Sequence, residues 1–240
     1  MSAIESAREL LNNAKAIAAL TGAGISAESG IPTFRGASGL WKQFRPEELA
    51  TPEAFARDPQ TVWEWYHWRR KLIAEAKPNA GHHALAQLEQ SAPKFTVVTQ
   101  NVDGLHQAAG SREVLELHGS IWKLRCTQCG REWVDQNTPE GRRLVYCQCG
   151  ALARPGVVWF GEGLPLSVWQ LAEQAIRNCD LFLVVGTSAV VYPAAGLVPL
   201  ARSSGAKIIE INIEASPMSG IVDIQLIGRA GEVLPRLIQE

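Results

Sequence analysis

Short apolar segments recur along the chain, and each ends in, or just before, threonine, glycine or another polar residue. None alternates strictly between apolar and polar positions, which is typical of strands buried on both faces of a parallel sheet. Helical spacing of apolar residues fills the stretches between these segments. The expected strands are Ala16–Thr21, Phe95–Thr99, Leu181–Gly186, Ile208–Asn212 and Ile224–Ile227, and the expected helices are Ile4–Ala14, Gly81–Gln90, Ser167–Asn178 and Pro193–Ser203. This alternation predicts an α/β fold with a doubly wound, Rossmann-like parallel sheet.

Two regions interrupt the alternation of strands and helices. Residues 34–80 are rich in aromatic residues and proline, and we expect them to form a helical excursion over one face of the sheet. Residues 121–158 contain four cysteines and few helical signals, which predicts a small inserted module of the zinc-ribbon type. The remaining ranges, 1–33, 81–120 and 159–240, are expected to form the Rossmann-like domain.

Composition narrows the classes of partner. The chain has 23 basic and 24 acidic residues, a net charge of -1, and 46% hydrophobic residues, enough for a sizeable core. This balance gives no electrostatic reason to expect specific binding to nucleic acid or to an anionic membrane. The sequence also has no apolar run near the roughly 20 residues of a membrane span, and its start lacks the features of a signal peptide. We therefore expect a cytoplasmic, monomeric protein.

Four cysteines indicate a metal site. Cys126 and Cys129 are separated by two residues, and Cys147 and Cys149 by one, with seventeen residues between the pairs. Two such pairs predict a tetrahedral site for zinc, in which four thiolates leave no open position, so the metal is structural. The alternatives are a redox pair or two disulfides. Cys179 stands apart and is expected to be a small buried residue.

A glycine-rich turn follows the first predicted strand. Gly22 and Gly24 permit a tight turn and a close approach of backbone N–H groups to a pyrophosphate, and Ala27 occupies the third position of the dinucleotide-binding pattern. Arg35 adds a planar cationic group suited to phosphate or carboxylate. On this segment alone, an ordinary strand-to-helix turn remains the alternative.

Six segments in register resemble the sirtuins, the class III protein deacylases, in a bacterial or archaeal form. The resemblance runs from about residue 10 to the C-terminus and is carried by Gly22–Gly36, Thr99–His106, Leu117–Gly119, Val157–Glu162, Gly186–Ser188 and Glu210–Asn212. It implies an enzyme that consumes NAD as co-substrate and removes acyl groups from the lysine side chains of protein substrates. The implied products are free lysine, nicotinamide and O-acyl-ADP-ribose.

The resemblance also implies roles for individual residues. His118 would be the base that activates a ribose hydroxyl, a task that suits a group titrating near neutral pH, and Asn101 would be the second catalytic residue. Main-chain pairing with the substrate peptide is expected along Val157–Glu162, with Val158, Trp159 and Phe160 in contact with substrate. The residues expected to bind NAD are Gly22, Ala23, Gly24, Phe34, Arg35, Gln100, Asn101, Asp103, Gly186, Thr187, Ser188, Asn212, Glu214 and Ala230.

Tyr66 and Arg69 indicate which acyl groups are accepted. Spaced i, i+3 in a segment of helical character, they project from one helix face, and together they can bind a carboxylate through a phenol and a guanidinium. A Tyr-x-x-Arg pair at this place, with Thr33 nearby, resembles the desuccinylase branch and implies succinyl and malonyl lysine beside acetyl lysine. An amphipathic helix whose aromatic residues only pack is the alternative.

Other functions would leave different products. A dehydrogenase would transfer hydride and release no nicotinamide, whereas an ADP-ribosyltransferase would leave ADP-ribose attached to protein. A zinc-ribbon adaptor that binds NAD and nucleic acid would show salt-dependent binding to DNA and no deacylation.

Overall fold

The computed structural model describes residues 2–35, 39–138 and 143–239. Within these ranges, a parallel sheet of six strands has the order β3-β2-β1-β7-β8-β9, and a second, antiparallel sheet has the order β5-β4-β6. The main sheet comprises β1 (Ile17–Thr21), β2 (Phe95–Thr99), β3 (Val114–Glu116), β7 (Leu181–Val185), β8 (Lys207–Asn212) and β9 (Ile224–Ile227). The small sheet comprises β4 (Gly119–Cys126), β5 (Glu132–Val134) and β6 (Ala153–Val157).

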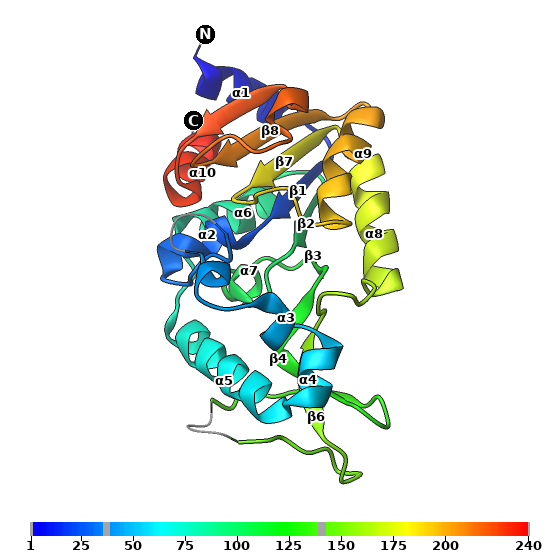
Figure 1. Ribbon diagram of the computed structural model, residues 1–240. Coiled ribbons are helices and arrows are strands. Elements are labelled where there is room, and N and C mark those ends of the chain that lie inside the picture. Colours follow the sequence, from blue (N-terminus) through cyan, green and yellow to red (C-terminus); the bar gives the residue numbers. More distant parts are fainter. Residues whose placement is uncertain (1, 36–38, 139–142, 240) are drawn as a thin grey trace.

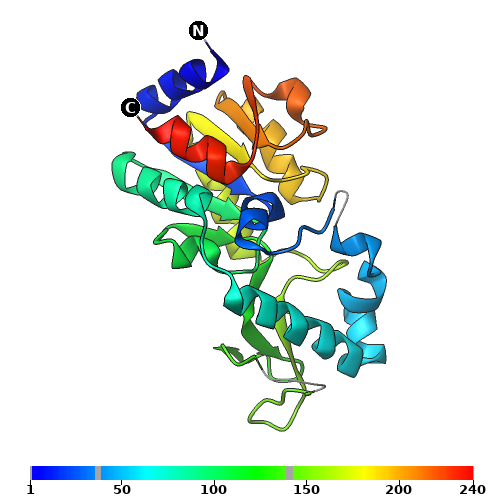
Figure 2. The same ribbon diagram turned by 90° about the vertical axis from the view of Figure 1, so that its left-hand side faces the viewer.

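Helices cover both faces of the main sheet, and α3, α4 and α5 lie beside the small sheet (Figures 1 and 2). The α-helices are α1 (Ala3–Asn13), α2 (Ala23–Ser26), α3 (Pro46–Leu49), α4 (Pro52–Arg57), α5 (Pro59–Glu75), α6 (Ala80–Ser91), α7 (Leu105–Ala108), α8 (Leu166–Arg177), α9 (Leu197–Ser203) and α10 (Ala230–Ile238). Single turns of 3₁₀ helix occur at η1 (Ala27–Ser29), η2 (Leu40–Lys42), η3 (Ala194–Gly196) and η4 (Ser219–Ile221). None of the helices in the described ranges combines the length and the apolar character that crossing a membrane requires.

The α/β fold predicted from the sequence is confirmed. All five expected strands are present with bounds within one residue of those predicted, and the main sheet gains a sixth strand, β3. The helix expected over 193–203 begins as the 3₁₀ turn η3 before α9. The last glycine of the glycine-rich segment, Gly36, lies outside the described residues.

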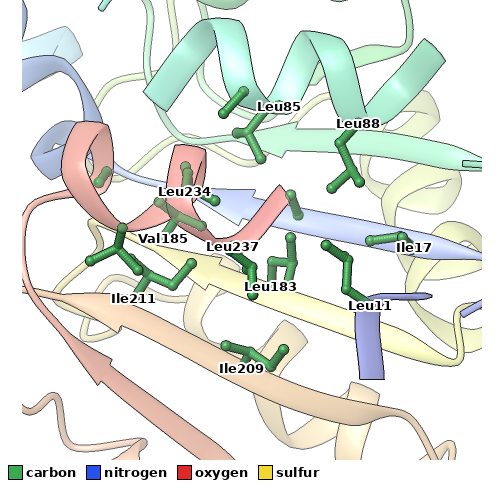
Figure 3. Packing of buried hydrophobic residues seen from close by; sticks show 14 of the residues in the cluster. Leu11, Ile17, Leu85, Leu88, Leu183, Val185, Ile209, Ile211, Leu234 and Leu237 are labelled. Carbon is green, nitrogen blue, oxygen red and sulfur yellow. The ribbon is translucent and has the colours of Figure 1, made fainter. Parts of the chain in front are cut away.

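The two faces of the main sheet are covered by different helices. Side chains alternate along each strand, so in β1 Ile17 and Ala19 enter one core and Ala18 and Leu20 enter the other. Figure 3 shows the first core, where α1, α6 and α10 place leucines over β1, β7 and β8. The second core is covered by α8 and α9. Burial on both faces explains the continuous apolar runs in the sequence.

The smaller part of the molecule lies at one end of the main sheet and has an aromatic core of its own (Figure 1). Helix α5 packs on the small sheet, and the indole of Trp63 donates a hydrogen bond of 2.9 Å to the carbonyl of Ala153 in β6. Arg70, fully buried, forms an ion pair of 3.1 Å with Asp135 just after β5. These contacts fix α5 relative to the cysteine-containing strands, so the residues on its other face have defined positions.

Candidate active site

A cavity of about 580 Å³ lies at the carboxyl ends of β1, β2, β7 and β8, between the main sheet and the smaller part. Ligands of open α/β sheets bind at this edge. Every residue predicted to bind NAD or substrate lines the cavity except Asp103. The residues brought together are Gly22, Ala23, Gly24, Phe34, Arg35, Tyr66, Arg69, Gln100, Asn101, His118, Val158, Trp159, Phe160, Gly186, Thr187, Ser188, Asn212, Glu214 and Ala230.

The glycine-rich turn packs directly against the end of β7. The N–H of Gly22 donates to the carbonyl of Val185 at 3.1 Å, and the N–H of Gly24 donates to the carbonyl of Gly186 at 2.8 Å. A Cβ added at Gly24 would lie 2.7 Å from that carbonyl oxygen. The glycines therefore permit close approach of two strand ends. The N–H groups of these two glycines are paired within the protein, so the approach of other backbone N–H groups of the turn to a pyrophosphate stays a prediction.

Polar side chains join the neighbouring strand ends. Gln100 Nε2 donates to Thr187 Oγ1 at 2.9 Å, which connects the end of β2 to the end of β7. Asn212 Nδ2 donates to the carbonyl of Thr187 at 2.9 Å, which adds the end of β8. Ala230, the first residue of α10, completes this wall beside Asn212. Polar groups from three strand ends therefore meet on one side of the cavity.

His118 lies between β3 and β4 with its ring held in one orientation. Its Nδ1 is 2.9 Å from the carbonyl oxygen of Gln100. A carbonyl only accepts, so Nδ1 carries the proton and the neutral ring keeps an unprotonated Nε2. Burial lowers the pKa of His118 below its ordinary value, against the opposing hydrogen bond to Gln100. At neutral pH the ring is therefore neutral and able to accept a proton.

Asp103 lies behind the cavity wall and not in it. Its carboxylate accepts hydrogen bonds from Ser26 Oγ at 2.8 Å and from the N–H of Leu105 at 2.9 Å, and burial raises its pKa. Asn101 Nδ2 donates to Ser26 Oγ at 3.2 Å and to the carbonyl of Gly22 at 3.1 Å. Ser26 thus connects Asp103 to Asn101, which lines the cavity.

Tyr66 and Arg69 lie side by side on α5 and both are buried, with exposed fractions of 2% and 8%. The guanidinium carbon of Arg69 lies 4.9 Å from the ring centres of Phe34 and Trp65 and 5.7 Å from that of Tyr66. No carboxylate of the described residues lies within 4.0 Å of its nitrogens. Burial lowers the pKa of Arg69 and raises that of Tyr66. Arg69 is therefore an aromatic-lined cation that lines the cavity with Tyr66 as a hydrogen-bond partner and without an ion-pair partner among the described residues.

The segment after β6 differs from the expected edge strand. The strand ends at Val157, and the next residues form a turn in which the N–H of Glu162 donates to the carbonyl of Trp159 at 3.1 Å. The N–H groups of Val158 and Phe160 donate to the carbonyls of His118 and Ala50, each at 2.9 Å. Most N–H groups here are therefore used within the protein. The side chains line the cavity, but main-chain pairing along the whole of Val157–Glu162 is not available in this structure.

Comparison with known proteins places these features in one family. A family profile described as the Sir2 family matches residues 22–193. The chain is 54% identical over 232 residues to "NAD-dependent protein deacylase 2" of Pyrobaculum aerophilum, covering 97% of this chain and 93% of that protein. The chain belongs to the Sir2 family.

Solved structures of Sir2 proteins agree over nearly the full length. A Sir2 homologue in complex with NAD has a TM-score of 0.92 and 49% identity, covering 97% of this chain and 91% of that one. A Sir2 protein with a p53 peptide and NAD has a TM-score of 0.88 and 32% identity, covering 99% and 98%. The glycines that allow the strand ends to approach, with the polar groups beside them, fit NAD as the co-substrate of this Sir2 protein.

The four clustered cysteines also fit a structural zinc ion. Their sulfur atoms lie within 4.8 Å of one another, with pairs such as Cys126–Cys149 at 3.5 Å and Cys129–Cys147 at 3.8 Å. Tetrahedral zinc with Zn–S bonds of about 2.3 Å requires sulfur pairs roughly 3.8 Å apart. The N–H groups of Gln128 and Cys129 donate to the Cys126 sulfur, which helps to lower its pKa to about 6 and favours the thiolate. The shorter spacing of the second pair therefore does not prevent a four-sulfur site.

Several residues of the cavity were not predicted from the sequence. Trp41 and Trp65 lie in the aromatic-rich stretch, where their enrichment was the available signal, and Tyr192 lies beyond the Gly186–Ser188 segment. Glu28 lines the cavity and accepts a hydrogen bond of 2.7 Å from the N–H of Gly231 in α10. These two residues are 203 positions apart, so no local pattern in the sequence could indicate that contact.

Proposed function

We propose that this protein removes acyl groups from lysine side chains of other proteins with consumption of NAD, and that it favours acyl groups ending in a carboxylate. Succinyl and malonyl lysine are the substrates of this class. Acetyl lysine, which has no second carboxyl group, is expected to be the weaker substrate. Relatives named NAD-dependent protein deacylase support the reaction, and Arg69 supports the preference.

The Arg69 guanidinium, which has no ion-pair partner in the described part of the chain, is the observation that carries the preference. A buried cation without a counter-ion is costly, and a carboxylate is the group that relieves that cost. Arg69 can bind a carboxylate through two parallel hydrogen bonds, with Tyr66 beside it as a further donor. The surrounding rings of Phe34 and Trp65 stack on the guanidinium and hold its plane. An acetyl group would leave this cation unpaired.

His118 is placed to act as the base of the proposed reaction. Bound NAD supplies an activated C–N bond to nicotinamide, so that the ribose can receive the acyl oxygen. The chain's own contribution is to hold Nε2 of His118 unprotonated, through the hydrogen bond from Nδ1 to Gln100, so that it can take a proton from a ribose hydroxyl.

One assay tests both halves of the proposal. Purified protein and NAD are incubated with three peptides that differ only in bearing acetyl, malonyl or succinyl lysine, and all products are identified by mass. We expect nicotinamide and O-acyl-ADP-ribose from each peptide, with the highest kcat/KM for a carboxylated cargo. ADP-ribose attached to protein, or nicotinamide retained on its ribose, would instead indicate a transferase or a dehydrogenase.

Replacing Arg69 isolates the preference. Arg69→Met keeps the length of the side chain and removes the charge, and we expect kcat/KM for succinyl lysine to fall about 100-fold, the equivalent of a lost charge-assisted pair. Acetyl lysine should be processed at an unchanged or higher rate. Arg57→Met, on the exposed surface of the neighbouring helix α4, is the matched control and should change neither rate. An unaltered succinyl rate in Arg69→Met would refute the preference.

A further inference from the structure

The indole of Trp159 is bonded to the hydroxyl of Tyr66. Trp159 Nε1 lies 2.8 Å from Tyr66 Oη, and both side chains are buried, with exposed fractions of 3% and 2%. Trp159 follows β6 and Tyr66 lies on α5, so the bond joins two separate elements of the cavity wall. The two residues are 93 positions apart in the sequence.

The direction of this bond is fixed by chemistry. An indole N–H can only donate, so the Tyr66 oxygen is the acceptor, and the phenol's single proton must point elsewhere. In the described part of the chain no acceptor for that proton is hydrogen-bonded to Tyr66. Arg69, the neighbouring polar group, has only donors. The Tyr66 proton is therefore left for a ligand in the cavity.

We propose that Trp159 is a positioning residue that selects for acidic acyl groups by orienting the Tyr66 hydroxyl. This inference rests on the proposed function and identifies a residue that acts on its substrate through another. With the indole bonded to one lone pair, the Tyr66 O–H presents its proton to the carboxylate that Arg69 binds. An acetyl group offers no oxygen at that place, so the orientation benefits carboxylated cargo alone.

Trp159 is itself held on several sides. The Arg154 guanidinium carbon lies 3.5 Å from the centre of the indole ring, and Arg154 binds Glu162 through two hydrogen bonds of 2.6 and 2.8 Å. Glu162 also accepts a hydrogen bond of 2.8 Å from the N–H of Trp159. Phe55 packs on the indole with ring centres 5.2 Å apart. Such an arrangement leaves the indole little freedom, which is what a group that orients another requires.

The direct test is Trp159→Phe, which keeps a buried ring and removes only the N–H. We expect the ratio of succinyl to acetyl kcat/KM to fall about tenfold, the loss of one buried hydrogen bond, with the change confined to KM for succinyl lysine. Trp63→Phe is the matched control, because it also removes a buried indole N–H on α5, here bonded to Ala153, away from the cavity. That control should leave the ratio of succinyl to acetyl kcat/KM unchanged.

A double-mutant cycle decides whether Trp159 acts through Tyr66. In a Tyr66→Phe background the hydroxyl is gone, so Trp159→Phe should cause no further loss with succinyl lysine. A further tenfold loss in that background, or an equal loss with acetyl and succinyl lysine, would show that Trp159 merely packs and would overturn the proposal.

A spectroscopic measurement keeps this proposal separate from the proposed function. The chain has three tyrosines, so Tyr146→Phe with Tyr192→Phe leaves Tyr66 as the only one. The intensity ratio of the tyrosine Fermi doublet in the Raman spectrum reports whether a phenol accepts or donates hydrogen bonds. We expect an acceptor signature without any peptide, weakened in Trp159→Phe, where the hydrogen bond from Arg69 is the one that remains. A donor signature in the free protein would overturn the proposal even if succinyl lysine is removed rapidly.

Discussion

The two walls of the cavity differ in the groups that form them. On the main-sheet side the wall consists largely of backbone and small polar groups at strand ends, such as Gly24 packed on Gly186. On the other side it consists of large aromatic side chains around buried charges, such as Phe34 and Trp65 around Arg69. A backbone wall depends on the fold and serves the part of the ligand common to every reaction. A side-chain wall can differ in a single residue, so it suits discrimination among cargoes.

The largest expected effect comes from the residue between the two walls. His118→Asn should lower kcat at least 1000-fold for acetyl and succinyl lysine alike, because it removes the proposed base without altering either wall. Binding of NAD, followed by calorimetry, should persist. A loss confined to one cargo would mean that His118 belongs to the selective wall.

The pH dependence of the reaction is a second test of His118. The pKa of His118 is below its ordinary value because of burial, so the neutral base predominates at pH 7. The kcat/KM should therefore be level near neutral pH and fall about tenfold per pH unit only below that lowered pKa. Both cargoes should follow the same profile. A rate that is already falling between pH 8 and 7 would contradict a lowered pKa.

A smaller effect is expected from the backbone wall. Gly24→Ala places a Cβ 2.7 Å from the carbonyl of Gly186, and we expect a loss of about 1–3 kcal/mol in the free energy of unfolding. The KM for NAD should rise roughly tenfold or more, by the same factor with each acyl peptide. Gly163→Ala, where the added Cβ meets nothing within 4 Å, is the control. A changed ratio of succinyl to acetyl rates would show that the backbone wall also takes part in selecting the acyl group.

The smallest effect on activity is expected from two buried histidines that lie outside the cavity lining. Burial lowers the pKa of His82 to about 4 and that of His106 to about 3, so the folded protein keeps both neutral. The unfolded chain binds these protons near pH 6.5, so stability falls as the pH drops below that value. His106→Gln should reduce this slope by roughly 1.4 kcal/mol per pH unit between about pH 6.5 and 4, as measured by urea unfolding. An unchanged slope in His106→Gln would contradict the lowered pKa of His106.

The sequence predicts the backbone wall well, because that wall follows from local patterns. Buried strands are continuous apolar runs, and the residue after each run lies at the strand end, which placed Gly22, Gln100 and Gly186 correctly at one edge. The sequence did not indicate the hydrogen-bond partner of each group at this edge. The N–H of Gly24 is used by Gly186, 162 positions later in the chain, and no spacing rule indicates such a contact.

The side-chain wall was only partly predictable. The i, i+3 spacing brought out Tyr66 and Arg69 because both lie on one helix, and the cysteine spacing brought out the metal site. The bond from Trp159 to Tyr66 depends on how α5 packs on the small sheet, which is a tertiary property. The turn after Val157 could not be distinguished from a continuing strand, because its apolar residues fit either structure.

The parallel register of the main sheet has a consequence for the length of the ligand. Thr99, Thr21, Val185 and Ile211 lie level across β2, β1, β7 and β8. With strands about 4.8 Å apart, the groups from Gln100 to Asn212 span roughly 14 Å. This width is fixed, because it depends on the spacing of the strands and not on any side chain. A one-residue insertion in any of these strands would shift its end by about 3.3 Å and put it out of line with the neighbouring strand ends. Substitutions of side chains along this edge would leave its width unchanged.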